Sequence, residues 1–65
     1  MTKNVSRLKI ARVAAGLSQF ELAQKVEVNE VAISRIETGR TTAPSVLKTK
    51  IAAILNKSTF EIFEK

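Results

Sequence analysis

The chain has 65 residues, and its 11 Lys and Arg against 6 Asp and Glu give a formal net charge of +5 and a pI near 10.1. A chain of this length forms one small domain, and the absence of Cys and His excludes disulfides, thiolate metal sites and the side chain that most often acts as a general base. No apolar run approaches the ~20 residues that cross a bilayer, and the chain starts without a readable signal peptide. We therefore expect a cytoplasmic protein with no membrane contact.

The positive charge is divided between two stretches of the chain. Residues 1–20 and 38–60 each carry four basic and no acidic side chains, whereas residues 21–37 carry two basic and four acidic ones. This division predicts an anion-binding surface built mainly from the two flanking stretches, with nucleic acid, an anionic membrane surface or an acidic protein as the class of partner. Ordinary solvated faces are the alternative interpretation of a net charge this modest.

Helical spacing of apolar residues predicts five short helices and no sheet. The first helix is expected over about residues 4–15, with Gly16 ending it in a left-handed conformation. Its inward face would hold Leu8, Ala11, Arg12 and Ala15. Ile10 and Val13 add apolar surface on the outer side of this helix, where we expect them to be partly exposed.

The second helix is predicted to open with a capping box. Ser18 can accept a hydrogen bond from the amide of Glu21 while the Glu21 carboxylate reaches back to the amide of Ser18. This helix would continue to about Val26, and Asn29 would cap a third helix that ends at residues 38–39. The residues expected to face inward from these two helices and their turn are Phe20, Leu22, Ala23, Val26, Val28, Ile33 and Ile36.

The rest of the chain predicts two more helices. Pro44 suits the first turn of the fourth helix, and Asn56 suits a left-handed cap at its end. The buried stripe of this helix would comprise Leu47, Ile51, Ile54 and Leu55. Ser58 and Glu61 form a second capping box that starts a final turn or two. The fold class is therefore all-α, with five helices joined by short connections.

Residues 18–38 form the arrangement that indicates a function. Two short helices are joined there by a very short turn at residues 27–28. The second of them leaves Glu30, Val31, Ser34 and Arg35 on its outer face. A helix held outward and backed by another fits a DNA major groove, which is about 12 Å wide. A plain helical hairpin is the alternative, and geometry alone leaves both interpretations open.

Two blocks of sequence carry a family resemblance. Residues 15–23 read AGLSQFELA and residues 33–39 read ISRIETG, with Val28-Asn29 between them and Pro44-Ser45 after them. At this separation the blocks resemble the Cro and phage-repressor (XRE-type) helix-turn-helix family, over about residues 5–63. The resemblance implies a compact five-helix, lambda-repressor-like DNA-binding domain with its helix-turn-helix motif at about residues 18–38. It also implies that Glu30, Val31, Ser34 and Arg35 read DNA bases.

Four residues are assigned to DNA phosphates, namely Ser18, Gln19, Arg40 and Thr42. Gln19 stands at the N-terminus of the second helix, where its side-chain amide, free backbone N–H groups and the positive end of the helix dipole can hold a phosphate. A solvent-exposed residue with no such role is the alternative. The resemblance further implies an internal ion pair between Arg12 and Glu37 that fixes the first helix against the third, and the alternative is an Arg12 that extends to water.

The sequence departs from the family pattern at several positions. Glu27 stands where the family usually has Gly, and if that position needs a positive φ, Glu costs roughly 1 kcal/mol more than Gly. Lys57 and Thr59 stand where the family usually has aliphatic residues, and Phe60 stands where it usually has a polar one. Phe60 either turns inward to fill the gap or stays out and meets a second subunit.

The expected function is a sequence-specific DNA-binding transcription regulator of bacterial or phage origin. We expect a repressor that binds a two-fold operator in double-stranded DNA as a homodimer. The alternative is an antitoxin-like or regulatory module of the same fold that binds a protein partner. An enzyme is not expected, because the acid–base candidates are surface-type Glu and Lys and no glycine-rich phosphate loop is present. No cofactor and no metal are expected.

Overall fold

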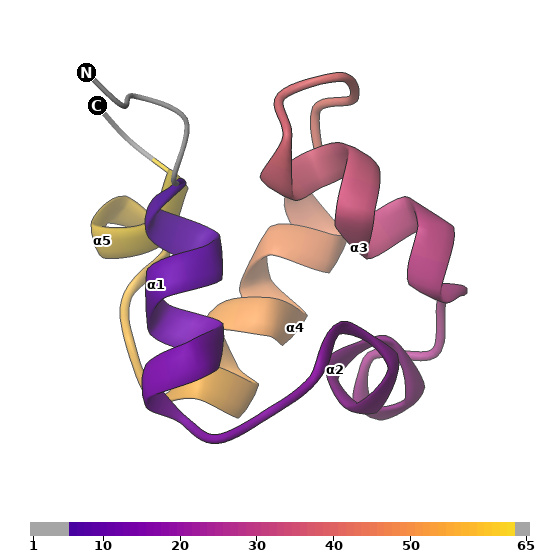
Figure 1. The fold of residues 1–65 in the computed structure, drawn as a ribbon. Helices are drawn as coiled ribbons and strands as arrows, with labels where there is room; N and C mark the ends of the chain where they lie inside the picture. The colour runs from indigo at the N-terminus through magenta and orange to yellow at the C-terminus, as the bar shows by residue number, and fades with distance from the viewer. Residues whose placement is uncertain (1–5, 64–65) are drawn as a thin grey trace, which may run out of the picture.

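The computed structural model describes residues 6–63, which form five α-helices and no strand (Figure 1). The helices are α1 (Arg7–Ala14), α2 (Gln19–Lys25), α3 (Glu30–Glu37), α4 (Ser45–Leu55) and α5 (Thr59–Phe63). The predicted all-α class with five helices is confirmed. Within the described residues, no helix is long and apolar enough to cross a membrane.

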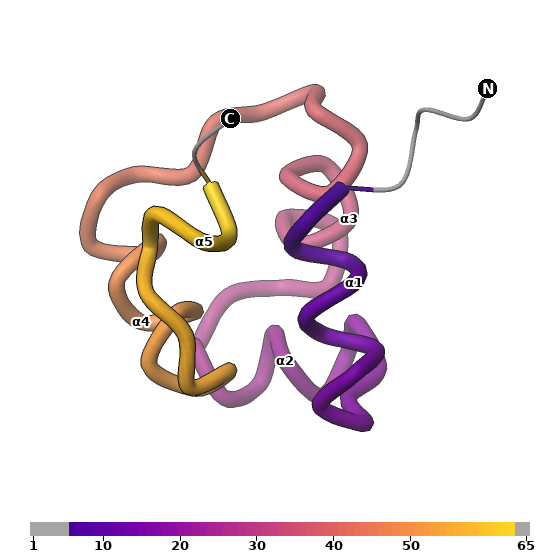
Figure 2. The backbone as a smooth tube through the Cα atoms, turned by 90° about the vertical axis from the view of Figure 1, so that its left-hand side faces the viewer, coloured from indigo at the N-terminus to yellow at the C-terminus, as the bar shows by residue number. Residues whose placement is uncertain are grey.

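The arrangement of the helices sets α2 and α3 apart as a pair. These two helices make the most extensive helix–helix contact, and α1 and α4 hold the pair through contacts with α3 and α2 respectively. Figure 2 shows α5 between α4 and α1, and α5 packs against both helices. The pair is therefore supported from behind by a scaffold of three helices.

One hydrophobic cluster takes residues from all five helices. Leu22 of α2, Ile33 of α3 and Ile51 of α4 are completely buried at its centre. The other buried members are Leu8, Ala11, Ala23, Val26, Ala52, Leu55 and Ile62. Burying one Leu or Ile side chain stabilises a fold by about 1.5–3 kcal/mol, so these contacts fix the relative position of α2 and α3.

Side-chain caps define where the helices begin. The Ser18 hydroxyl accepts from the Glu21 amide at 3.0 Å and the Ser18 amide donates to the Glu21 carboxylate at 2.8 Å, which confirms the first capping box. Ser58 and Glu61 form the second one in the same way. Because the Ser58 backbone N–H and hydroxyl stabilise the charged form, the pKa of Glu61 lies below its ordinary value. Asn29 caps α3 by accepting from the Ala32 amide at 2.8 Å.

The boundaries of two helices differ from the prediction. Ser6 accepts a hydrogen bond from the amide of Lys9 and thereby caps α1, so this helix begins at Arg7, while the expected start at Asn4 lies outside the described residues. Pro44 is the N-cap of α4 and does not lie in its first turn. Gly16 (φ 78°) and Asn56 (φ 59°) both adopt the left-handed conformation predicted for them.

Three residues expected to face inward are exposed. Phe20 is 53% exposed, because it stands two residues before Leu22 and thus about 200° away around a helix whose inward stripe is already occupied. Ile54 is 40% exposed, since the small Ala52 shifts the buried stripe of α4 toward the other side. Ala15 is exposed because it follows the end of α1.

The turn between α2 and α3 carries a left-handed residue with a side chain. Glu27 has φ 62°, so the position does need the left-handed conformation, in which Glu costs roughly 1 kcal/mol more than Gly. Its carboxylate lies 3.9 Å from the ammonium of Lys50 on α4; the Glu27 side chain is largely exposed and that of Lys50 is half exposed. An ion pair of this kind contributes little, so it does not offset the strain of the turn.

We expect Glu27→Gly to raise the free energy of unfolding by about 1 kcal/mol, because Gly adopts this conformation without a Cβ clash. In a domain of this size that gain corresponds to about 4–8 °C in the unfolding temperature. Thermal unfolding followed by circular dichroism measures it. Glu27→Ala is the matched control, since it removes the carboxylate but keeps the Cβ, and it should not stabilise the domain. A Gly variant that is no more stable than the Ala variant would contradict the prediction.

Candidate nucleic-acid interface

The outward face of α3 is the centre of the candidate site. Ile33 and Glu37 are buried against the rest of the domain, which turns the opposite side of the helix to solvent. Val31 and Arg35 are exposed on that side, and Glu30 is exposed at the first position of the helix. Ser34 is half-buried at its edge. The four residues predicted to read bases thus all reach the surface of α3, with Ser34 the least accessible of them.

A buried ion pair joins α1 to the end of α3. Arg12 Nε donates to Glu37 Oε2 at 2.5 Å, and Arg12 Nη2 donates to Glu37 Oε1 at 3.3 Å. Both residues are at most 7% exposed. The third guanidinium nitrogen, Nη1, donates to the carbonyl of Leu17 at 2.8 Å in the turn between α1 and α2. Arg12 thus does not extend to water, and its guanidinium ties α1, the following turn and α3 into one unit.

Gln19 is part of the same network. Its side-chain Nε2 donates to Glu37 Oε1 at 2.9 Å, and the residue is half-buried. One carboxylate oxygen of Glu37 therefore accepts from both Arg12 and Gln19. This contact fixes the orientation of the Gln19 side-chain amide at the N-terminus of α2. The NH₂ group has two N–H donors, and the second one is not used by this hydrogen bond. Neither this link nor the Leu17 carbonyl contact was predicted from the sequence.

The other predicted phosphate ligands lie on the surface at two turns. Ser18 is exposed at the N-cap of α2, where its hydroxyl oxygen accepts from Glu21 and its proton remains available to donate. Arg40 and Thr42 are exposed in the loop after α3. The amide of Arg40 donates to the carbonyl of Arg35 at 2.9 Å, which folds this loop back onto the end of α3. The start of the loop is thereby held against the C-terminal end of α3.

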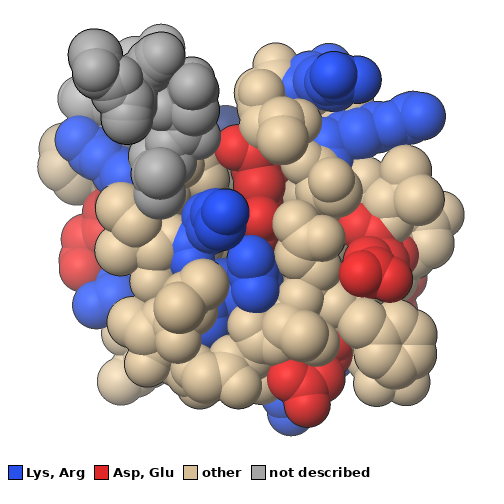
Figure 3. All heavy atoms as spheres, in the orientation of Figure 1, with Lys and Arg blue, Asp and Glu red and all other residues tan. Residues whose placement is uncertain are grey.

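The charge of this surface is mixed. Figure 3 shows Lys and Arg side chains in the middle of the face and near the turn after α3, with acidic side chains between them and along the opposite edges. Arg12, one of the basic residues of the first stretch, is buried in the ion pair with Glu37 and adds no exposed charge. Lys3 lies outside the described residues. The first basic stretch consequently contributes less exposed charge than its sequence indicates.

The geometry agrees with comparisons to known proteins. Residues 5–56 match the helix-turn-helix domain family, which is four-fifths of the chain. The chain belongs to this family. The fold is also similar to a solved structure, the restriction-modification controller protein C.AhdI from Aeromonas hydrophila, with a TM-score of 0.81 and 32% sequence identity over 88% of this chain and 83% of that one. The resemblance noted in the sequence is confirmed.

Membership of the helix-turn-helix family assigns a general role to the paired helices. In such domains the second helix of the motif enters the DNA major groove while the first crosses above the backbone. The motif here consists of α2 and α3, and α3 carries the exposed polar face. The protein is a DNA-binding protein of the class that regulates transcription. No cluster of side chains that could hold a metal ion is present within residues 6–63.

Proposed function

We propose that the protein is a sequence-specific repressor that binds a two-fold operator through the major groove. The observation that carries this proposal is the outward face of α3, where Glu30, Val31 and Arg35 are exposed on a helix locked in place by the buried pair of Arg12 and Glu37. A recognition helix needs this rigidity, because base contacts tolerate little displacement. Similarity to a protein named as a restriction-modification controller supports a role in controlling genes.

The side chains of α3 have complementary chemistry for base edges. Arg35 can donate two hydrogen bonds to guanine O6 and N7, and Val31 can pack on a thymine methyl group. Glu30 can accept from cytosine N4, and Ser34 can act as donor or acceptor. Glu30 also repels phosphates, so it lowers affinity for unrelated DNA. Its position at the start of α3 is favourable for the helix dipole as well, which gives it a second, structural role.

Phosphate contacts would position α3 in the groove. We assign them to Ser18 and Gln19 at the N-terminus of α2, and to Arg40 and Thr42 in the loop after α3. The Glu37 contact at 2.9 Å supports this role for Gln19, because it holds the amide at the end of the helix where the dipole attracts an anion. Arg40 supplies a charge next to Arg35 through the folded loop.

A single recognition helix reads only a few base pairs, so we propose that two copies bind together. The DNA-binding unit would comprise residues 5–63, and two units would occupy half-sites about one helical turn apart, ~34 Å. We place the contact between the copies at α5 and the loop before Pro44. Such a protein would act in the cytoplasm of a bacterial cell, where its DNA is located.

The salt dependence of binding tests the proposal. Fluorescence anisotropy should show affinity for duplex DNA falling linearly with the logarithm of salt concentration, because each neutralised phosphate releases counterions. Selection of bound sites from random duplexes should then return a two-fold consensus. DNA binding that is absent at low salt, together with a salt-insensitive protein partner, would instead support the antitoxin-like or regulatory protein-interaction module.

We expect Arg40→Ala to weaken binding to all duplexes alike and to reduce the salt slope by about one phosphate equivalent. The reason is that a phosphate contact carries charge but no sequence information. Anisotropy titrations at several salt concentrations measure both quantities. Lys25→Ala is the matched control, since it removes one charge at the opposite end of α2 from the proposed phosphate site. A changed sequence preference in Arg40→Ala would show that Arg40 reads bases.

A further inference from the structure

Asn29, the residue that precedes α3, has one polar atom that the fold uses and one that it does not. Its side-chain oxygen Oδ1 accepts from the amide of Ala32 at 2.8 Å. Because a backbone N–H can only donate, the nitrogen Nδ2 of the same side-chain amide is turned away from that bond. Within residues 6–63, Nδ2 donates to no group, and Asn29 is exposed. The side chain therefore presents two unused N–H donors at the beginning of α3.

The chain is held in place on both sides of Asn29. Before it, the amide of Val28 donates to the carbonyl of Ala23 at 3.0 Å, and the Val28 side chain packs against the hydrophobic cluster. After it, the bond to the Ala32 amide fixes the Asn29 side chain over the first turn of α3. A donor that is already held in one orientation loses little conformational entropy on binding, so it can contribute to affinity and to selectivity.

Asn29 stands where a recognition helix meets base edges. The second helix of a helix-turn-helix motif contacts bases mainly with the residues at its beginning. Glu30, the next residue, is assigned to such a contact and can only accept hydrogen bonds, so Asn29 supplies the complementary donor beside it. The major-groove edge of a G·C pair likewise presents the O6 acceptor of guanine beside the N4 donor of cytosine. The two neighbouring residues thus match both kinds of group on a base-pair edge.

We propose that Asn29 is a fifth base-reading residue, whose amide donates to the keto oxygen of guanine (O6) or thymine (O4) in the major groove. The usual pairing of Asn with adenine requires the amide oxygen as an acceptor as well as the nitrogen as a donor. Here the oxygen is turned to the Ala32 amide, so the donor alone faces outward. The inference rests on the proposed function and deepens it by naming a further residue that selects a base.

Asn29→Asp tests the assignment, because it keeps the shape of the side chain and the cap of α3. One carboxylate oxygen can still accept from the Ala32 amide, and Asp is as good an N-cap as Asn. The other oxygen puts an acceptor in place of the donor, which suits the amino groups of cytosine and adenine. Selection of bound sites from random duplexes should return a keto base at one position of each half-site for the wild type, and an amino base at that position for the variant.

A charge-matched control is needed, because Asn29→Asp also lowers the net charge by one and so weakens every phosphate contact. Lys57→Gln makes the same change of charge, and Figure 1 shows the connection between α4 and α5, which holds Lys57, on the opposite side of α1 from α3. The control should bind all duplexes slightly more weakly and keep the wild-type consensus. Affinity of Asn29→Asp for the wild-type site should fall about tenfold further than that of the control.

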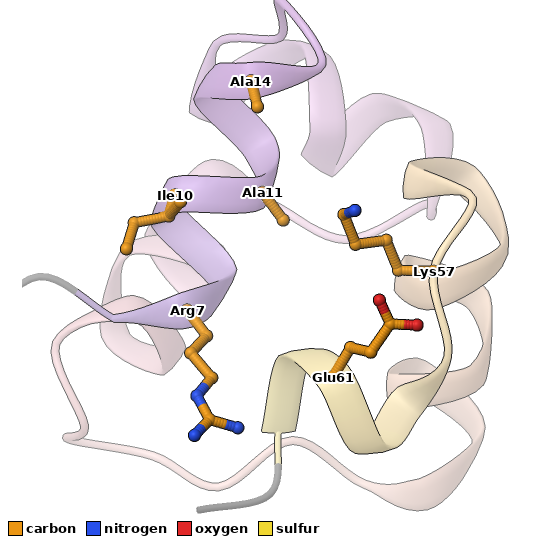
Figure 4. Close-up of a pocket in the computed structure, with 6 residues that line it drawn as sticks. All are labelled: Arg7, Ile10, Ala11, Ala14, Lys57 and Glu61. Atoms are coloured by element: carbon orange, nitrogen blue, oxygen red, sulfur yellow. The ribbon is translucent and has the colours of Figure 1, made fainter.

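Lys57 can be replaced without disturbing the core. It lines a hollow of about 330 Å³ between α1 and α5, together with Arg7, Ile10, Ala11, Ala14 and Glu61. Figure 4 shows the Lys57 side chain extending toward α1. Phe60 is 66% exposed and does not turn inward to fill this hollow. Lys57 is therefore exposed there, and Lys57→Gln should unfold at the same temperature as the wild type.

The same measurements can overturn the inference. If Asn29→Asp returns the wild-type consensus and loses no more affinity than Lys57→Gln, Asn29 is a cap and nothing more. If the variant weakens binding to all duplexes alike and by more than the control does, the amide contacts a phosphate and not a base. A wild type without any consensus would overturn the proposed function together with this inference, whereas a consensus that Asn29→Asp leaves unchanged overturns this inference alone.

A second variant removes the donor without adding a charge. Asn29→Ser also caps a helix but lacks the amide, so it should lose the preference for a keto base and gain no preference for an amino base. Thermal unfolding verifies that Asn29→Asp and Asn29→Ser both keep the stability of the wild type. An Asn29→Ser variant that selects the keto base as strongly as the wild type does would contradict the assignment.

Discussion

Replacing Arg12 by Met is expected to lower the free energy of unfolding by about 3–5 kcal/mol, the cost of leaving a buried charge without its partner. The Glu37 carboxylate would remain buried at 6% exposure with the Gln19 amide as its single remaining side-chain donor. A domain of this size rarely exceeds about 3–5 kcal/mol of total stability, so the variant should be largely unfolded at 25 °C. Urea denaturation followed by far-ultraviolet circular dichroism measures the loss.

Two further variants show how much of this loss of stability comes from the unpaired buried charge. Lys50→Met removes the exposed pair with Glu27 and should cost less than about 1 kcal/mol. The double variant Arg12→Met with Glu37→Met removes both charges and should recover much of the stability, because an apolar pair of similar volume leaves no charge uncompensated. If Arg12→Met costs no more than Lys50→Met, the buried pair does not stabilise the fold in the way described.

Local signals explain why much of the fold could be predicted from the sequence. The two capping boxes, the Asn29 cap and the left-handed Asn56 each depend on residues within four positions of one another, and all four are present. Helix boundaries followed these signals to within a few residues. Two starts differ slightly: Ser6 provides a cap for α1 that was not predicted, and Pro44 is the N-cap of α4 and not part of its first turn.

Features that depend on how helices cross could not be predicted in the same way. The contact of Gln19 with Glu37 spans 18 positions and forms only when the start of α2 meets the end of α3. Phe20 was expected to face inward with the other apolar residues of α2, yet Leu22, Ala23 and Val26 form the buried side of this segment and Phe20 lies outside it. The hollow between α1 and α5 arises likewise from residues far apart in the sequence.

Arg35→Ala is expected to cost about 1–3 kcal/mol at the preferred DNA site, or roughly 5- to 150-fold in affinity, because a bidentate contact to guanine is lost. The side chain is exposed on the outward face of α3, and its own carbonyl accepts from the amides of Arg40 and Thr41, which fixes the helix end. The loss should fall on one base pair per half-site. Competition binding with single-base variants of the selected site locates that base pair.

Arg35→Lys distinguishes charge from base reading at the same position. Lys keeps the positive charge but lacks the planar fork, so this variant should retain the salt slope of the wild type and still lose discrimination at the affected base pair. Arg40→Ala should do the reverse, with weaker binding and an unchanged sequence preference. If Arg35→Ala discriminates at every position as well as the wild type does, then specificity arises from sequence-dependent DNA shape and not from direct contacts of α3.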